Sequence, residues 1–145
     1  IFMVLNETYA LSNGVQIPKL GLGTWFIDDD KAAQAVRDAV AMGYRHMDTA
    51  QAYANERGVG EGIRTCGIAR EELFVTTKLT AEIKSFEEAV KAIDTSLRTM
   101  GLDYIDMMII HLFPTLGKDG KTKFMTKTPL IFQRRLAFEG ILILR

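Results

Sequence analysis

Four side chains that could hold, give or take a proton lie near the ends of apolar segments in this sequence. Asp48 and Lys78 each end one such segment, His111 ends another, and Tyr53 follows Asp48 by five residues. If the segments are parallel strands of one sheet, their carboxyl ends meet at one edge, where α/β proteins build active sites. Together these groups would form a candidate set of acid, base and electrostatic partners.

Taken singly, each of these residues has a structural explanation. Lys78 could be a solvated lysine or pair structurally with Asp48, and His111, flanked by apolar residues, could be a hydrogen-bonded core histidine. Tyr53 could pack its ring as a loop aromatic. Trp25, the only tryptophan, could belong to the core or line the mouth of a site, because it follows a predicted strand end.

The elements that must position these groups are strands and helices in alternation. Predicted strands end near Thr24, Asp48, Lys78 and His111, which are 24, 30 and 33 residues apart. That is the spacing of βα units in an α/β fold. The four strands are predicted over residues 20–24, 46–49, 73–79 and 104–111.

A helix is predicted after each of the first three strands. The first begins at Asp28–Asp30 and ends at Gly43, and the second has Asn55 as its N-cap. The third begins with a capping box formed by Ser85 and Glu88. Its apolar positions recur at helical spacing and are all predicted to be core, namely Phe86, Val90, Ile93, Leu97 and Met100.

An N-terminal β-hairpin is predicted before the first of these strands. Asn13–Gly14 stands between segments of alternating apolar residues, and an Asn-Gly pair supplies the two positive φ angles of a two-residue hairpin turn. The hairpin and the βα units fit within one domain, because 145 residues are too few for two well-packed ones.

The composition excludes several classes of function. Lys and Arg together number 18 and equal the number of Asp and Glu, so the chain lacks the basic surplus of a nucleic-acid-binding protein. Its apolar runs fall short of the roughly 18 residues of a membrane span. Cys66 is the only cysteine, which rules out an internal disulfide and a cysteine-rich zinc site. We therefore expect a soluble cytoplasmic protein without a metal site.

Charge divides the chain near Phe113–Pro114. Residues 1–111 hold 11 basic and 16 acidic side chains, whereas residues 112–145 hold 7 basic and 2 acidic ones. We therefore assign residues 1–114 to the βα units and residues 115–145 to a separate tail. Within that tail, residues 139–144 are typical of a helix end followed by a strand.

The local sequence resembles the aldo-keto reductase superfamily. The segment from Gly43 to Ala50, followed at the family's spacing by Glu56, Val59 and Gly60, is similar to its first signature at every position. The resemblance runs from about Leu11 to His111 and includes Leu20–Trp25, Arg70–Lys78, Leu102–Asp106 and Ile109–His111. It implies a (β/α)8 barrel of the TIM type, of which this chain holds about the first four βα units, with the hairpin closing the bottom.

The resemblance also implies NADPH-dependent reduction of small-molecule aldehydes or ketones to alcohols, and a full-length relative that is monomeric. Carried over by position, the family's catalytic residues are Asp48, Tyr53, Lys78 and His111. The residues beside the cofactor are Gly23, Thr24, Trp25 and Asp48. The residues facing the substrate are Trp25, Tyr53 and His111.

The chemistry of carbonyl reduction explains why these residue types occur together. Hydride transfer creates an alkoxide, which needs a proton as it forms. A tyrosine with a pKa of about 10 is a reluctant acid at neutral pH, but an ammonium group beside it stabilises the phenolate and lowers that pKa. An aspartate can hold the ammonium in place, and a histidine can orient the carbonyl oxygen. The hydride itself belongs to the cofactor.

The chain departs from the family after His111. Family barrels run to roughly 300 residues, and their second half supplies most of the contacts to the cofactor. Here Leu112–Phe113–Pro114 replaces the family's pattern, and residues 122–145 do not follow it. Together with the basic charge of this segment, the departure from the family indicates that residues 115–145 are a divergent tail, truncated or frameshifted. We therefore expect this chain alone to bind NADPH weakly or not at all, to show no appreciable carbonyl reduction, and to self-associate.

Two other functions are compatible with the sequence. A non-catalytic barrel fragment could act through contacts with protein partners, which open sheet edges would favour. A Schiff-base aldolase could use Lys78 as its nucleophile. The aldolase is disfavoured, because Asp48 beside the lysine would keep its amine charged and poorly nucleophilic.

Overall fold

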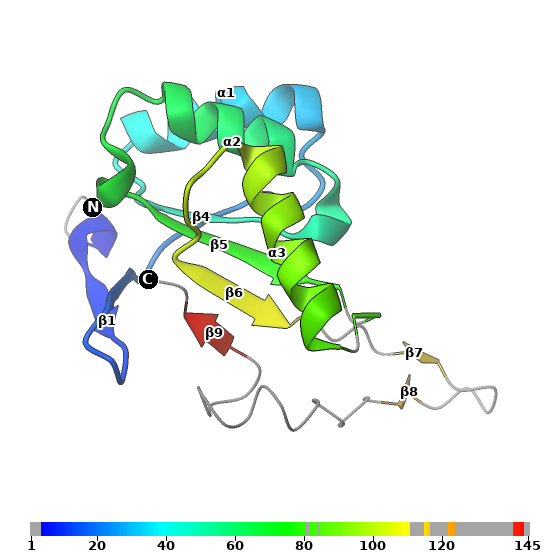
Figure 1. Ribbon diagram of the computed structural model, residues 1–145. Helices are drawn as coiled ribbons and strands as arrows, with labels where there is room; N and C mark the ends of the chain where they lie inside the picture. Colours follow the sequence, from blue (N-terminus) through cyan, green and yellow to red (C-terminus); the bar gives the residue numbers. More distant parts are fainter. Residues whose placement is uncertain are drawn as a thin grey trace.

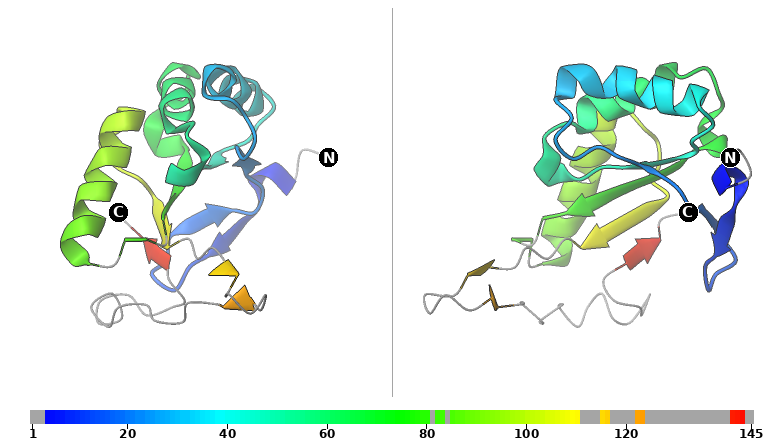
Figure 2. Two further views of the ribbon diagram at one scale, coloured as in Figure 1. Left: turned by 90° about the vertical axis from the view of Figure 1, so that its right-hand side faces the viewer. Right: turned by 180° about the vertical axis from the view of Figure 1, so that it is seen from behind.

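The computed structural model describes residues 4–80, 82–83, 85–110, 115–116, 122–123 and 141–143. The strands of this part of the chain include a five-stranded sheet in the order β3-β4-β5-β6-β9, and the described helices α1 to α3 cover one face of it (Figures 1 and 2). The predicted alternation of strand and helix is therefore confirmed.

The parallel part of the sheet follows the predicted strands. It consists of β3 (Leu22–Gly23), β4 (His46–Asp48), β5 (Phe74–Leu79) and β6 (Met107–Ile110). Strand β6 begins later than predicted, and just before it the carboxylate of Asp106 accepts the N–H of Val75. The free edge of β6 is occupied by β9 (Ile141–Ile143), which runs antiparallel to it. The strand expected within residues 139–144 is thus present.

Short antiparallel pairs lie outside this sheet. Strands β7 (Thr115–Leu116) and β8 (Thr122–Lys123) form one pair. Strands β1 (Thr8–Ala10) and β2 (Gln16–Pro18) form the predicted hairpin, preceded by the 3-10 helix η1 (Val4–Asn6). The hairpin lies toward the end of the sheet opposite to the arrowheads of β5 and β6 (Figure 1), which is the end that the resemblance predicted.

The hairpin turn differs from the prediction. The backbone of Leu11 donates to Val15 O, so three residues form the turn instead of two. Of these, only Gly14 has a positive φ, at 84°, and Asn13 instead accepts the N–H of Val15 with its side chain at 3.1 Å. A three-residue turn needs a single left-handed position, so glycine alone satisfies it.

The helices begin where the sequence predicted them. They are α1 (Asp29–Ala41), α2 (Glu56–Thr65) and α3 (Phe86–Met100), accompanied by the short 3-10 helices η2 (Gln51–Tyr53) and η3 (Arg70–Glu72). Both bonds of the predicted capping box between Ser85 and Glu88 are present. Asp28 and Asn55 precede their helices as predicted, but neither side chain makes a capping bond.

The inner face of α3 was predicted incorrectly at its first two turns. Phe86 and Val90 are exposed, whereas Ala89, Ser96 and Met100 are buried. Hydrophobic periodicity cannot detect this face, because one of its buried positions is a serine whose hydroxyl is satisfied by hydrogen bonds.

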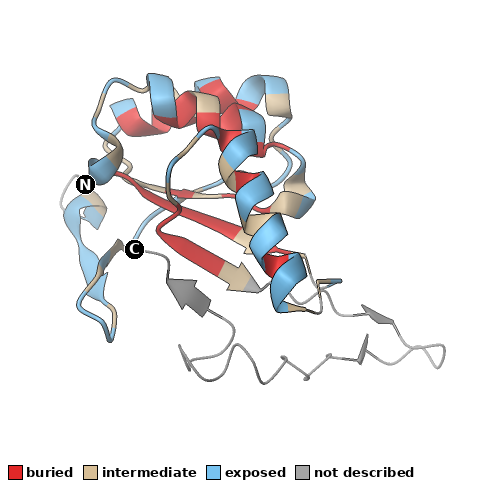
Figure 3. Ribbon diagram, viewed as in Figure 1, coloured by how far each residue is buried: buried red, intermediate tan, exposed pale blue. Residues whose placement is uncertain are grey.

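The core lies between the sheet and the helices (Figure 3). Met47, Val75 and Met108 project from the strands to meet Val36 and other side chains of the helices. Helix α2 approaches α3 so closely that a Cβ on Gly60 would overlap the backbone of Met100. This close packing fixes α2 against the end of α3. None of the helices in the described ranges is long and apolar enough to span a membrane.

Candidate active site

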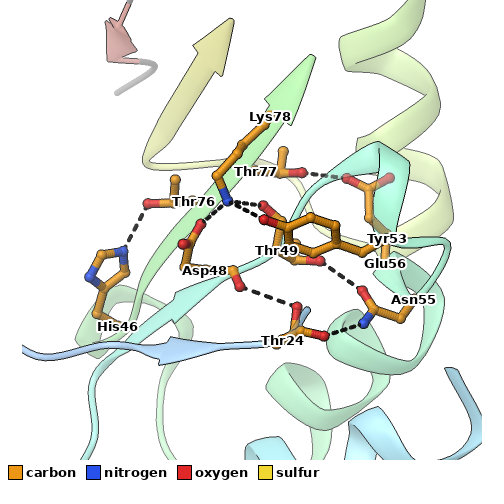
Figure 4. A network of polar contacts seen from close by, with 10 residues as sticks. All are labelled: Thr24, His46, Asp48, Thr49, Tyr53, Asn55, Glu56, Thr76, Thr77 and Lys78. Atoms are coloured by element: carbon orange, nitrogen blue, oxygen red, sulfur yellow. Dashed lines mark hydrogen bonds and ion pairs between the residues drawn. The ribbon is translucent and has the colours of Figure 1, made fainter. Parts of the chain in front are cut away.

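The centre of the candidate site is the ammonium group of Lys78 on β5. Its Nζ donates to Asp48 Oδ1 at 2.5 Å, to the carbonyl oxygen of Thr49 at 2.9 Å and to Tyr53 Oη at 3.3 Å (Figure 4). An ammonium has three protons to donate, so these contacts use its full donor capacity. The structure therefore brings together three of the four residues that the resemblance predicted as catalytic.

Parallel pairing explains why Lys78 and Asp48 meet. Asp48 is aligned with Thr76 on the neighbouring strand, so Lys78 stands one pleat further along on the same face of the sheet. The Lys78 side chain is 11% exposed and that of Asp48 is 37% exposed. The ammonium is therefore largely withdrawn from water, while solvent still reaches the carboxylate.

Tyr53 reaches this pair because the chain folds back through η2. Gln51 attaches η2 to α3 by donating to Ser96 Oγ at 2.9 Å. Ala54 then takes a left-handed conformation with a φ of 56°, which turns the chain from the strand ends into α2. The spacing of five residues between Asp48 and Tyr53 is thus the length of one bent loop.

Two exposed aromatic rings form a stack with the ring of Tyr53. The Trp25 ring stacks on that of Tyr53 with 6.3 Å between centroids, and the Phe26 ring stacks on Trp25 at 4.5 Å. Trp25 is 65% exposed and Phe26 is 86% exposed, so Trp25 lies at the rim of the site and the prediction that it could be a core residue is wrong. Phe26 also has a φ of 61°, a conformation that costs an L-residue about 1–2 kcal/mol. Sequence reasoning missed Phe26, since an aromatic residue signals nothing about its backbone.

The residues predicted to face the cofactor differ in what they offer. A Cβ on Gly23 would meet no described atom within 4 Å, so the backbone there is open beside Asp48. Thr24, by contrast, is fully buried, and both its N–H and its hydroxyl donate to Asp48 O. Open backbone flanked by Trp25 and a partly exposed carboxylate fits a flat, polar ring, whereas Thr24 supports the strand end from within.

Of the two histidines, His46 lies within the described residues. His111 lies outside the described residues. His46 lies on β4, where its Nε2 is 2.9 Å from Thr76 Oγ1 and its ring meets Phe74 edge-on. Burial lowers the pKa of His46, although the nearby carboxylate of Asp48 opposes this effect. The imidazole of His46 therefore has a structural role on β4.

Two consecutive buried polar residues, Asn55 and Glu56, lie just after Tyr53 in the chain. Sequence reasoning did not predict their contacts. Asn55 is fully buried and bonds to residues of two other loops. Glu56 accepts hydrogen bonds from Thr77 Oγ1 at 2.6 Å and Ser96 Oγ at 3.1 Å. Burial raises the pKa of Glu56, and the two hydroxyl donors partly oppose this. Their signals in the sequence are the predicted N-cap at Asn55 and the place of Glu56 in the family's first signature, and neither signal specifies the hydrogen-bond partners.

This arrangement can perform proton transfer assisted by a nearby cation. An oxygen that accepts a bond from an ammonium keeps its own O–H as a donor, and negative charge left on Tyr53 Oη would face Lys78 at close range. Within the described ranges, no three His, Cys, Asp or Glu side chains are grouped so as to hold a metal ion. The described side chains that meet at this site are a tyrosine, a lysine and an aspartate.

A sequence model described as the Aldo/keto reductase family matches residues 19–119. Among curated proteins, the 9,11-endoperoxide prostaglandin H2 reductase of Trypanosoma cruzi is 47% identical over 117 residues, which are 80% of this chain and 39% of that protein. This chain spans about two fifths of the length of the curated relatives it matches.

Solved structures show the same relationship. An aldo/keto reductase from Brucella melitensis superposes with a TM-score of 0.73 at 47% identity, covering 83% of this chain and 45% of that one. An aldo-keto reductase from Bombyx mori, solved in complex with NADP, superposes with a TM-score of 0.69 at 38% identity, covering 81% of this chain and 41% of that one. These neighbours are (β/α)8 barrels, and the parallel βα units and hairpin described above correspond to one part of that fold.

Proposed function

The chain belongs to the aldo/keto reductase family, and we propose that it provides the proton-donating half of an NADPH-dependent oxidoreductase that reduces aldehyde or ketone groups to alcohols. Residues 1–114 form the barrel part in this proposal, and residues 115–145 form a divergent tail. The substrate is a small molecule with a reactive carbonyl group.

The observation that carries the proposal is the position of Lys78 Nζ, within hydrogen-bond distance of both Asp48 and Tyr53. A tyrosine is a useful acid only when the charge that it retains after giving up its proton is stabilised. The ammonium provides that stabilisation at 3.3 Å from Oη. The carboxylate of Asp48 and the carbonyl of Thr49 hold the ammonium in place.

In the proposed reaction, Tyr53 donates its hydroxyl proton to the carbonyl oxygen of the substrate as that oxygen becomes an alkoxide. The charge that remains on Oη faces the Lys78 ammonium. Trp25 borders the space that the substrate enters, and His111 is proposed to orient the carbonyl oxygen. NADPH, when bound, supplies the hydride, and Gly23, Trp25 and Asp48 are the described residues proposed to lie beside its nicotinamide.

The contacts of Lys78 oppose the Schiff-base alternative. A lysine nucleophile must lose its proton to attack a carbonyl group. Lys78 instead directs all of its donors at oxygen atoms, one of which belongs to a carboxylate at 2.5 Å. In this arrangement the amine serves as a hydrogen-bond donor to three oxygen atoms and is not directed at a carbonyl carbon.

A chimera tests the proposed function. The segment of the Brucella melitensis reductase that aligns with residues 19–110 is replaced by that segment of this chain, and NADPH oxidation is followed with an aromatic aldehyde as substrate. Turnover that disappears in the Tyr53→Phe version of the chimera supports the proposal. The parent reductase serves as the positive control. A folded chimera that binds NADPH and shows no turnover would overturn the proposal and favour a non-catalytic role through partner contacts.

A further inference from the structure

The loop from Thr24 to Ile27 is a tight turn that presents the exposed aromatic pair. Ile27 N donates to Thr24 O at 3.1 Å, so the residues between them, Trp25 and Phe26, form the tip. We refer to residues 24–27 as the aromatic turn. Its backbone is strained, because Phe26 has a φ of 61°. The ring of Phe26 is almost fully exposed. An exposed ring has few packing contacts that could hold such a conformation.

The side chain of Asn55 supplies the missing constraint. Its Nδ2 donates to Thr24 O at 2.8 Å and to Ile27 O at 2.8 Å, the two carbonyl groups that flank the tip of the aromatic turn. Its Oδ1 accepts the hydroxyl proton of Thr49 at 2.9 Å (Figure 4). The orientation of the amide is determined by these partners, since a flipped group would direct its oxygen at two carbonyl oxygens.

These bonds join the aromatic turn to the proton-donating part of the site. Asn55 follows Tyr53 by two residues along the chain. The hydroxyl group of Thr49 donates a hydrogen bond to Asn55, and the carbonyl oxygen of Thr49 accepts one from the Lys78 ammonium. Asn55 is fully buried, so water cannot replace these bonds. One carboxamide therefore fixes the place of the Trp25 ring relative to the Tyr53 ring, which lies 6.3 Å away.

We propose that Asn55 is a positioning residue that holds the aromatic turn in register with Tyr53, and so sets where a carbonyl substrate can lie against both rings. The second part of this statement rests on the proposed function. The first part concerns only the ground-state structure of the chain, and it can be tested without turnover.

The test is an NMR measurement on the purified chain. Trp25 is the only tryptophan, so ring-to-ring NOEs between Trp25 and Tyr53 can be assigned directly. The variant Asn55→Asp has the same shape and keeps an acceptor for Thr49, but it places carboxylate oxygen against two carbonyl oxygens. We expect the Trp25–Tyr53 NOEs to be lost in this variant, while methyl NOEs between core residues such as Val75 and Met108 are retained.

A matched control makes the same chemical change elsewhere. Asn13 lies on the hairpin and is exposed, and its Oδ1 accepts the N–H of Val15. Asn13→Asp keeps that acceptor, so the Trp25–Tyr53 NOEs should persist. If Asn55→Asp retained these NOEs in a folded protein, the positioning role would be wrong.

A measurement on the unsubstituted chain covers the case in which Asn55→Asp does not fold. Both Nδ2 protons of Asn55 should be protected from exchange with water, as should the amide proton of Ile27. Rapid exchange of the Nδ2 protons in the folded chain would overturn the proposal. These readouts contain no catalytic step, so an inactive chimera would contradict the proposed function and leave the positioning role of Asn55 standing.

Discussion

Two ion pairs connect neighbouring βα units at opposite ends of the sheet. Lys78 and Asp48 meet at the carboxyl ends of β5 and β4 with 2.5 Å between Nζ and Oδ1. Arg70 and Asp106 meet at the amino ends of β5 and β6 with 2.6 Å between Nη2 and Oδ2. The two pairs resemble each other in distance, and they differ in what surrounds them.

The amino-end pair is closed by the protein. Asp106 is fully buried, and its Oδ2 accepts both the Arg70 guanidinium and the N–H of Val75. Arg70 also donates to the carbonyl oxygens of Leu73 and Tyr104, and its guanidinium stacks over the Tyr104 ring. Backbone groups and an aromatic ring thus take up the remaining contacts of both charged groups. These contacts hold the loop before β5 against the start of β6.

The carboxyl-end pair differs from the amino-end pair because its cation also contacts an ionisable hydroxyl group. Lys78 directs one donor at Tyr53 Oη, and Asp48 is still partly exposed to water. Barrel enzymes place chemistry at the carboxyl ends of strands and stability at the amino ends. The comparison therefore teaches that charge pairing is common to both ends, and that access for a reactant distinguishes the site. The predictions below test that distinction.

The largest effect is expected at the closed pair. Replacing Asp106 by alanine leaves the largely buried Arg70 guanidinium without its carboxylate and removes the acceptor of Val75 N, so the free energy of unfolding should fall by about 3–5 kcal/mol. Denaturant unfolding followed by circular dichroism measures this loss. Asp103→Ala, which removes an exposed aspartate nearby, should change stability little. Equal effects of the two substitutions would show that the closed pair does not brace the fold.

The next largest effect concerns activity at the open pair. In the chimera described above, Tyr53→Phe removes the proposed proton donor and should lower turnover by about 100-fold or more, the scale of general acid catalysis. NADPH affinity should barely change, because the ring remains. Tyr44→Phe, which lies within the exchanged segment just before β4, at the opposite end of the strand from Asp48, is the control. Near-normal turnover of the Tyr53→Phe chimera would contradict the proposed mechanism.

A smaller effect on stability is expected when the open pair is broken. Lys78→Met keeps most of the apolar stem and leaves Asp48 accessible to water, so the free energy of unfolding should fall by only about 1 kcal/mol. The same denaturant experiment measures it, with the exposed Lys91→Met as control. A loss as large as that of Asp106→Ala would mean that both pairs serve mainly to hold the fold together.

The smallest expected effect is a pH dependence of the free energy of unfolding that arises from Glu56. Burial raises the pKa of Glu56 above 4.5 in the folded chain, so the folded state binds a proton that the unfolded state releases between these two pKa values. The stability contributed by protonated Glu56 is present in full below pH 4.5 and is lost as pH rises through the folded pKa.

Glu56→Gln removes this dependence while retaining partners for Thr77 and Ser96. The unfolding free energy of the variant, relative to the unsubstituted chain, should therefore rise from acidic to neutral pH. The exposed Glu72→Gln is the control and should give a flat difference. A flat difference for Glu56→Gln as well would show that burial does not perturb this carboxyl group.

Much of the fold could be predicted from local patterns. The βα alternation, the places where α1 to α3 begin, and the capping box of Ser85 and Glu88 each depend on residues close together in the chain. The errors occurred where a local signal had two solutions. Asn13–Gly14 supports either hairpin turn, and the apolar positions of α3 mark a helix without specifying which side meets the sheet.

For the candidate site, the sequence by itself determined which groups stand at the ends of parallel strands, because strand spacing and side-chain alternation are local properties. This was sufficient to bring Asp48, Tyr53 and Lys78 to one edge. Only the tertiary structure decided how they are held. The hydrogen bonds of Asn55 to Thr24 and of Glu56 to Thr77 join segments more than twenty residues apart. A buried amide or carboxyl group is stable only if the packed fold supplies its partners. No local pattern encodes that condition, since it depends on where other segments of the chain come to lie.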